Sequence, residues 1–459
     1  MSLLSEFLNI TQDWRDVFPQ QRTFERALRQ ATGALVCMGR RCLSRIIWTN
    51  GGHTRSWSAE YFLHSRCRWE PQALFRPMLK RALAFCPQRL VGVALDDTRL
   101  RKTGRSIPQA FYQRDPLSPP FHVNLVLGLR FLQASLLLPL HRNAPVGARA
   151  LPIHFEEVSR VKRPGKKATD EMKQQYRQAA KQKNLSRSFV QTAKRLRQEL
   201  DLAGGQKKIL VLAGDGSFCN RTCFSEIPER AVLLVRARKD AKLCFQATDD
   251  PRRFYATEKF NPEQVRKDDG RSWKTTKIFY GGKRRKIRYK EVVNVYWQSG
   301  AKQRPLRLIA IAPTPYRKSK NKKLYYRDPA YLLTTDLRSP ANQLLQIYCD
   351  RWQIEVNHRE EKDTLGVGQA QLWNATSVPK QPVLVVAAYS ALLLASLLAF
   401  GPERGIAYAE LPKWRRHARR PSCLDLITLL RKQMVEQPQL LDPLDLKITD
   451  SGLVHSAAA

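Results

Sequence analysis

The sequence predicts an α/β fold, and three observations support this prediction. Short apolar runs typical of buried strands recur at Leu90–Leu95, Ile209–Ala213 and Ala231–Arg236. Between the first two runs, Leu185–Leu200 has apolar residues at helical spacing. The chain has 459 residues, enough for roughly two to four domains, because single cores rarely exceed about 250–300 residues. Strands that alternate with helices indicate a sheet covered by helices.

Further strands are predicted on both sides of this framework. Phe121–Leu140 contains two strand-like runs, around Gly128 and Ala134, and Arg99–Pro120 is a basic, Pro-containing connection before them. Leu306–Ala312 and Tyr331–Thr335 are two more short apolar runs. Within residues 238–304, alternating apolar and polar residues flank a Gly281–Gly282 pair, which is a hairpin signal. We therefore expect a β-rich insertion at residues 238–304.

Charge is the most unusual property of the composition. The chain has 80 Lys and Arg against 40 Asp and Glu, a formal net charge of +40, and its pI is about 10.3. The excess is spread along the chain, with local peaks at Lys162–Lys167, Lys173–Arg197, Lys283–Lys290 and Arg317–Lys323. A broad basic surface suits a phosphate backbone. Anionic membrane and RNA are the competing partners on charge alone, and nucleic acid is the partner we expect.

The cysteines and the apolar segments argue against a secreted or membrane protein. Nine cysteines include no C-x-x-C pair, so we expect reduced thiols in an intracellular, cytoplasmic protein. One stretch, Val383–Phe400, reaches the apolar length of a membrane span. It is rich in Ala and Ser, and we interpret it as a buried helix. No membrane partner is expected.

The segment Tyr348–Lys362 has neither Gly nor Pro and is predicted to be one helix. On a helical wheel, Arg351, Glu355 and Lys362 lie within about 60° of Tyr348. A carboxylate framed by two cations and a phenol suits phosphoryl transfer, because the carboxylate can hold a metal while the cations bind phosphates. A solvated helix with internal salt bridges is the alternative that spacing alone leaves open.

Two other acidic residues follow apolar strands. Asp96 and Asp215 each stand at the end of such a run, where a charge is costly unless it binds a partner. Together with Glu355 they would make a carboxylate cluster for two hard cations, which prefer oxygen ligands. Asp97 is the alternative to Asp96, because neighbouring strand residues face opposite sides of the sheet.

These residues resemble the DDE transposases of bacterial insertion sequences. The resemblance is to the group with a Y-x2-R-x3-E-x6-K helix, insertion-sequence family four and its relatives, whose spacing Tyr348, Arg351, Glu355 and Lys362 match. It extends over roughly residues 90–400. The resemblance implies an RNase H-like catalytic domain, with a mixed five-stranded sheet and flanking helices, interrupted by the β-rich insertion and flanked by helical N- and C-terminal regions.

The resemblance also implies roles for single residues. Asp96, Asp215 and Glu355 would be the catalytic residues and would bind two Mg²⁺ ions, with Mn²⁺ as the expected substitute. Tyr348, Arg351 and Lys362 would grip DNA phosphates and bases. Trp297 or Trp273 in the insertion would stack on a flipped base, although packing is their simpler role. His358 would position a phosphate or the metal-binding carboxylate, unless it is a neutral buried histidine.

The functional hypothesis is a cut-and-paste DNA transposase. It would bind the terminal inverted repeats of its element as a homodimer on double-stranded DNA, cleave by metal-assisted hydrolysis and join the 3′-hydroxyl ends to target DNA, through a hairpin. We expect it in the cytoplasm, on the bacterial nucleoid when bound. Alternatives are an inactive DNA-binding descendant and an RNase H-like structure-specific nuclease.

The expected domain organisation follows from this hypothesis. It comprises a helical DNA-binding domain at 1–88, the two parts of the catalytic domain at 89–237 and 305–400, the insertion at 238–304, and a C-terminal region at 401–459 for dimerisation or DNA contact.

Overall fold

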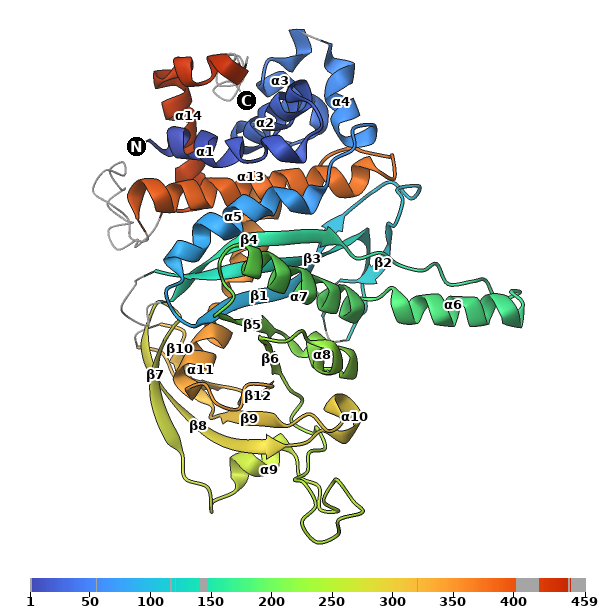
Figure 1. Ribbon diagram of the computed structural model, residues 1–459, viewed down its shortest axis with the longest axis vertical. Coiled ribbons are helices and arrows are strands. Elements are labelled where there is room, and N and C mark those ends of the chain that lie inside the picture. Colours follow the sequence, from blue (N-terminus) through green and yellow to red (C-terminus); the bar gives the residue numbers. More distant parts are fainter. Residues whose placement is uncertain are drawn as a thin grey trace.

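The computed structural model describes residues 2–54, 56–115, 118–119, 121–140, 147–319, 321–401, 421–444 and 446. Most of the C-terminal region expected to serve dimerisation or DNA contact, namely residues 402–420 and 447–459, lies outside the described residues. Figure 1 shows a large twisted sheet beneath a layer of helices, with further strands at its far edge.

The centre of the fold is a mixed sheet of the RNase H-like kind. Its strands are β1 (Leu90–Arg101), β3 (Leu125–Pro139), β4 (Ala148–Glu157), β5 (Ile209–Gly214) and β6 (Ala231–Arg236). β1 pairs antiparallel with β3, and β3 pairs antiparallel with β4. On the other side of β1, β5 and then β6 run parallel to it. The predicted five-stranded mixed sheet is therefore present, in the order β4-β3-β1-β5-β6.

The sheet is larger than the prediction, because the later strands extend it. β12 (Ala330–Thr334) pairs with β6, and β9 (Leu306–Ile311), β8 (Lys283–Val295) and β7 (Lys274–Tyr280) follow in that order. With β2 (Phe111–Arg114) at the opposite edge, the whole sheet has ten strands. The β7–β8 hairpin of segment 238–304 thus lies on the edge of the same sheet.

The hairpin turn between β7 and β8 follows directly from the sequence. Gly281 and Gly282 both have positive φ, 61° and 79°, as a two-residue turn of type I′ requires. A second, two-stranded sheet pairs β10 (Thr314–Arg317) with β11 (Leu324–Arg327).

Two predictions between residues 99 and 140 are wrong: the division of Phe121–Leu140 into two runs, and the connection at 99–120. The runs around Gly128 and Ala134 form one strand, β3, with a register shift between Ala134 and Ser135. Gly128 fits because a Cβ there would lie 2.6 Å from the Leu100 carbonyl oxygen, so this glycine allows close approach and does not end the strand. The expected connection at 99–120 contains the end of β1 and all of β2. The antiparallel pairing with β3 stabilises both.

Helices cover both faces of the central sheet. α7 (Leu185–Leu202), close to the predicted helix, buries Phe189 and Leu196 in one core with the strands. α8 (Arg221–Glu226) packs beside α7. On the other face, α11 (Ala341–Asp350) and α12 (Gln353–Arg359) bury Leu344 and Ile354 against the sheet.

The helix predicted at Tyr348–Lys362 is divided, which corrects the sequence analysis. α11 ends at Asp350, a turn at Arg351–Trp352 follows, and α12 runs into a π-helical turn at Glu360–Thr364. The amide of Trp352 bonds the carbonyl of Cys349, three residues back, as Ile354 bonds Arg351. The tight turn and the wider π turn change the angle between successive side chains, so the single stripe predicted from a regular helical wheel does not apply along the whole segment.

A long apolar helix, α13 (Ser377–Phe400), lies under the helical layer (Figure 1). Its length and composition would allow it to cross a membrane, yet 83% of its most apolar window is buried inside the molecule. It packs against β4 on one side and against α1 and α2 on the other. This agrees with the interpretation as a core helix.

The helical layer combines both ends of the chain. Its N-terminal members are α1 (Leu3–Gln12), α2 (Gln21–Val36), α3 (Leu43–Thr49), α4 (Trp57–Ser65) and α5 (Arg76–Ala82), and α14 (Cys423–Glu436) joins them. Trp14 and Met434 are buried in the same core as α13 and the central strands. The remaining helices are α6 (Asp170–Gln182), α9 (Pro262–Lys267) and α10 (Gln298–Ala301).

Candidate active site

Three acidic side chains converge at one end of the central strands. β1 and β5 are parallel neighbours, with Ala94 opposite Ala213, so Asp96 and Asp215 emerge at the same end of the sheet. α12 packs against β1 and β4 and brings Glu355 to Asp96. One ligand atom each of Asp96, Glu355 and His358 lies within 4.8 Å of the others. The sequence predicted a cluster of Asp96, Asp215 and Glu355, whereas the close cluster in the structure joins Asp96 and Glu355 to His358, with Asp215 outside it.

The strand register separates Asp96 from Asp97. Ala94, two residues before Asp96, packs with Ile354 of α12, whereas Leu95 belongs to the core on the opposite face. Because side chains alternate along a strand, Asp96 faces α12 and Asp97 faces away. Asp97 instead accepts two hydrogen bonds from Arg130, at 2.7 Å from Nε and 3.0 Å from Nη2. The geometry therefore favours Asp96 as the metal ligand.

Asp96 occupies an unfavourable position for a charged group. Burial and the neighbouring Glu355 carboxylate raise its pKa well above the ordinary value, and Asp215 adds to this effect. Arg351 opposes the shift, with Nη1 at 3.6 Å from Asp96 Oδ2. A bound proton or a cation relieves the repulsion between carboxylates held together in this way, and the Arg351 guanidinium supplies part of the positive charge.

Asp215 lies directly after β5 and is held by its own loop. Its carboxylate accepts hydrogen bonds from the amide and the hydroxyl of Ser217, at 2.9 and 3.1 Å. Its charge contributes to the raised pKa of Asp96, but it stands outside the close cluster of Asp96, Glu355 and His358. Asp215 is therefore the acid that a second cation, or a shift of this loop, would engage.

His358 is a buried, neutral imidazole. Burial, together with the nearby cations Lys362 and Arg351, lowers its pKa to about 3. Its Nε2 has no hydrogen-bond partner within the described part of the chain, and an unpartnered buried nitrogen is costly. A ring nitrogen beside two carboxylates can ligate a metal ion. On sequence alone, His358 is either a positioning residue or a neutral buried histidine, because its closeness to Asp96 and Glu355 depends on tertiary packing.

The donor set fits a divalent cation. Two carboxylates and a neutral imidazole are ordinary ligands for Mn²⁺ and related ions, and carboxylates with water suit Mg²⁺. The raised pKa of Asp96 and the unpartnered His358 nitrogen are both costs that a bound cation would remove. Asp96, Glu355 and His358 are thus the residues able to hold such an ion.

The remaining residues of the predicted stripe lie around this cluster. The Arg351 guanidinium stands 5.8 Å from the centre of the Tyr348 ring, and burial raises the pKa of Tyr348. Arg351 Nε and Nη1 are buried without a hydrogen-bond partner among the described residues. Lys362, whose pKa is lowered by burial, points into the adjacent cleft. Lys362 lines the cleft, whereas Arg351 is shared between its ion pair with Asp96 and the space beside the cluster.

The two tryptophans expected to stack on a base lie elsewhere. Trp297 packs edge-on against Phe224, with ring centres 6.0 Å apart, and a Cβ on Gly300 would overlap its ring. Trp273 lies near Arg288 and Lys290, whose charged groups are 5.4 and 4.7 Å from its ring centre. Neither residue lines the clefts next to the cluster. The structure thus gives both rings packing contacts.

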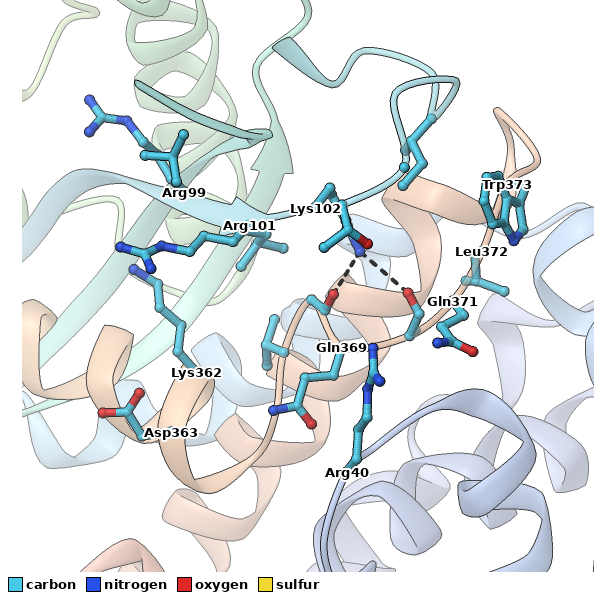
Figure 2. Close-up of a pocket in the computed structure, with 18 of the residues that line it drawn as sticks. Arg40, Arg99, Arg101, Lys102, Lys362, Asp363, Gln369, Gln371, Leu372 and Trp373 are labelled. Atoms are coloured by element: carbon cyan, nitrogen blue, oxygen red, sulfur yellow. Dashed lines mark hydrogen bonds between the residues drawn. The ribbon is translucent and has the colours of Figure 1, made fainter. Parts of the chain in front are cut away.

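A basic cleft of about 790 Å³ is lined by Arg99, three residues after Asp96, and by Lys362, seven residues after Glu355. Arg40, Arg99, Arg101, Lys102 and Lys362 line it; Figure 2 shows Lys362 reaching toward Arg101, the Arg99 guanidinium turned away from them, and Trp373 at the far side. Lys102 Nζ donates to the carbonyls of Gly368 and Ala370, at 2.7 and 3.4 Å. Apart from Lys362, the sequence analysis did not identify these residues as site residues, because they come from three distant segments.

A second cleft, of about 690 Å³, begins at Gly216, next to Asp215. Arg236, Arg238, Lys239 and Arg266 line it. Arg238 and Arg266 are paired with acids in this cleft, Asp240 and Glu263. One cleft therefore adjoins the α12 side of the cluster and the other adjoins the β5 side.

The RNase H-like sheet and the acidic cluster at its end define the class of an α/β nuclease of the DDE type. A comparison with protein-family models agrees: the family described as DDE superfamily endonuclease matches residues 15–329. The chain belongs to this family and is a DDE transposase-like protein. The match includes Asp96 and Asp215 and ends before Glu355, whose place rests on the structure. Among curated proteins, no match was found.

Proposed function

We propose that the chain is a cut-and-paste DNA transposase of the group with a Y-x2-R-x3-E-x6-K helix. The observation that carries this proposal is the meeting of Asp96 and Glu355 beside the unpartnered His358, with Asp215 at the same end of the sheet. Its substrate would be the terminal inverted repeats of its element in double-stranded DNA, joined as a homodimer to target DNA through a hairpin. The expected location is the cytoplasm, on the nucleoid when bound.

Each part of the site has a defined role in this proposal. Bound Mg²⁺ would activate a water or a 3′-hydroxyl and stabilise the leaving oxygen during in-line displacement. Asp96, Glu355 and His358 hold the ion, and Asp215 completes the acidic set. Arg351 and Lys362, on either side of Glu355 in sequence, bind the phosphates next to the scissile bond. No protein nucleophile is required.

The two clefts supply the path for the DNA. Arg99, Arg101 and Lys102 line one of them and Arg236 lines the other. A backbone bound in both clefts would pass Lys362 in one and Gly216, next to Asp215, in the other, which would bring a phosphate near the cluster. Cations from distant segments bind the regular phosphate backbone, and such contacts do not distinguish one base sequence from another.

Cleavage and joining of the element's own ends test the proposal. The purified chain would be incubated with Mg²⁺ or Mn²⁺ and a labelled duplex from the DNA that borders its gene, plus an unlabelled target. We expect wild type to nick and join, Glu355→Gln to bind without doing either, and the exposed control Glu229→Gln to behave as wild type.

Other outcomes would identify the alternatives. Binding without metal-dependent cutting by wild type would indicate an inactive descendant. Cutting of branched DNA without joining would indicate a structure-specific nuclease. Either result would overturn the transposase proposal.

A further inference from the structure

One helix of the protein lies outside the folded core. α6 projects from the body as a free-standing rod (Figure 1), and none of its 13 residues is buried. Helices of this length are marginal in water when no tertiary contact supports them. Because α6 buries none of its residues in this chain, a binding partner would explain the helix, and its charge indicates one.

The segment that carries α6, residues 160–183, is here called the basic arm. It contains nine Lys or Arg and two Asp or Glu. The two acids, Asp170 and Glu171, stand in the first turn of α6, where they favour the helix dipole. The Thr169 hydroxyl accepts the Met172 amide at 3.3 Å and caps the helix. The acids and the cap thus stabilise the helix, and the excess cations face solvent.

The arm begins at the border of the basic cleft. Its first residue, Arg160, stacks over Phe111 of β2 at 4.5 Å, and its amide bonds the Gln109 side chain at 3.2 Å. The same strand β2 accepts two bonds from the cleft residue Arg99, at 3.1 Å to Gln113 and 2.7 Å to the Arg114 carbonyl. Positive charge therefore continues from the cleft, across β2, into the arm.

We propose that the basic arm docks along the phosphate backbone of double-stranded DNA that extends beyond the active-site clefts. This inference rests on the proposed function, because it takes DNA as the substrate and names a second surface that holds it. At about 1.5 Å per residue, α6 is roughly 20 Å long, the length of about six base pairs. The arm adds affinity and orientation without reading sequence, because its contacts are charges on a regular backbone.

Salt-dependent binding tests the arm directly. The probe is a fluorescent duplex of 30 base pairs and arbitrary sequence, titrated at several salt concentrations without divalent metal. The arm variant replaces Lys173, Arg177, Lys181 and Lys183 by Gln. The control variant replaces Arg22, Lys80, Arg89 and Lys207, four exposed cations elsewhere on the surface, by Gln. Both lose the same charge, and neither set is buried in the core.

The expected result is a change in the salt slope of the arm variant alone. The slope of log K against log salt is negative, and each lost phosphate contact makes it about 0.9 less steep. Loss of four contacts should therefore make it less steep by roughly 3 to 4. Bound duplex should also protect the arm of wild type from trypsin. Equal slopes for the arm variant and wild type, or an equal change in the control, would overturn the proposal.

The remaining outcomes separate this inference from the proposed function. A slope change confined to double-stranded RNA would refute the DNA assignment. Cleavage and arm binding are tested separately. If the arm variant shows the slope change while wild type never cuts DNA, the role of the arm is supported and the transposase proposal is refuted. If wild type cuts DNA and the arm variant has the same slope as wild type, the transposase proposal is supported and the role of the arm is refuted.

Discussion

Exchange of one carboxylate at a time distinguishes Asp96 from Asp97. In Asp96→Asn, the site loses the carboxylate that faces Glu355, so metal-dependent cleavage should fall by more than about 100-fold. The magnitude follows because loss of a group that merely supports a metal ligand already costs about 10–100-fold. In Asp97→Asn, the cluster remains intact and cleavage should stay within about tenfold of wild type.

The stabilities of the two variants should change in different directions. Asp97→Asn removes the charge and one of the two acceptor oxygens that Arg130 contacts at 2.7 and 3.0 Å, and should lower the free energy of unfolding by about 1–3 kcal/mol. Asp96→Asn removes a buried carboxylate whose pKa is raised by burial and by Glu355. Without metal at neutral pH, it should be as stable as wild type or more so.

Three assays decide this prediction together: Mn²⁺ titration by calorimetry, cleavage of labelled DNA, and denaturant unfolding of the metal-free proteins. A folded Asp96→Asn variant that still binds Mn²⁺ and cuts DNA would refute the assignment of Asp96. An inactive but stable Asp97→Asn variant would indicate that the other face of β1 carries the chemistry.

Three further predictions follow from the geometry. Because the pKa of Asp96 is raised in the metal-free protein, a bound cation must displace a proton from it near neutral pH. Between about pH 6 and 9, the affinity for Mn²⁺ should therefore rise and the number of protons released on binding should fall. A Kd that does not change with pH would contradict this prediction. His358→Gln should weaken Mn²⁺ binding by about tenfold or more with little change in the circular dichroism spectrum, whereas unchanged affinity would show that the imidazole is not a ligand. Gly282→Val places a side chain at φ 79° with no atom within 4 Å of the new Cβ, so the backbone alone should cost about 1–2 kcal/mol; no loss in denaturant unfolding would exclude the strain.

The metal-free stability of the protein should also depend on pH in a defined direction. Asp96 has a higher pKa in the folded chain than in the unfolded chain, so the folded state binds the proton more tightly. Its contribution to stability is fully present below the unfolded pKa and is lost as pH rises through the folded pKa. The Asp96→Asn variant should lack this part of the profile.

Local patterns determined much of the fold. The apolar runs at Ile209–Ala213 and Ala231–Arg236 became β5 and β6, and the Gly281–Gly282 pair became the hairpin turn between β7 and β8. These elements are predictable because strand burial and positive φ depend on residues close in sequence. The run at Phe121–Leu140 was divided wrongly, since Gly128 serves a contact with β1 that no local pattern records.

Composition and local patterns were enough to identify a basic α/β protein with acids at the ends of two strands and a carboxylate between cations on a later segment. Which acids meet depends on how the strands and α12 pack. The alternation of β1 sends Asp96 toward the α12 side and Asp97 toward Arg130, and a turn at Arg351–Trp352 separates α11 from α12. His358 and the cleft cations joined the site for the same reason. Their neighbours are distant in sequence, so packing of α12 and the strands, and not local spacing, places them there.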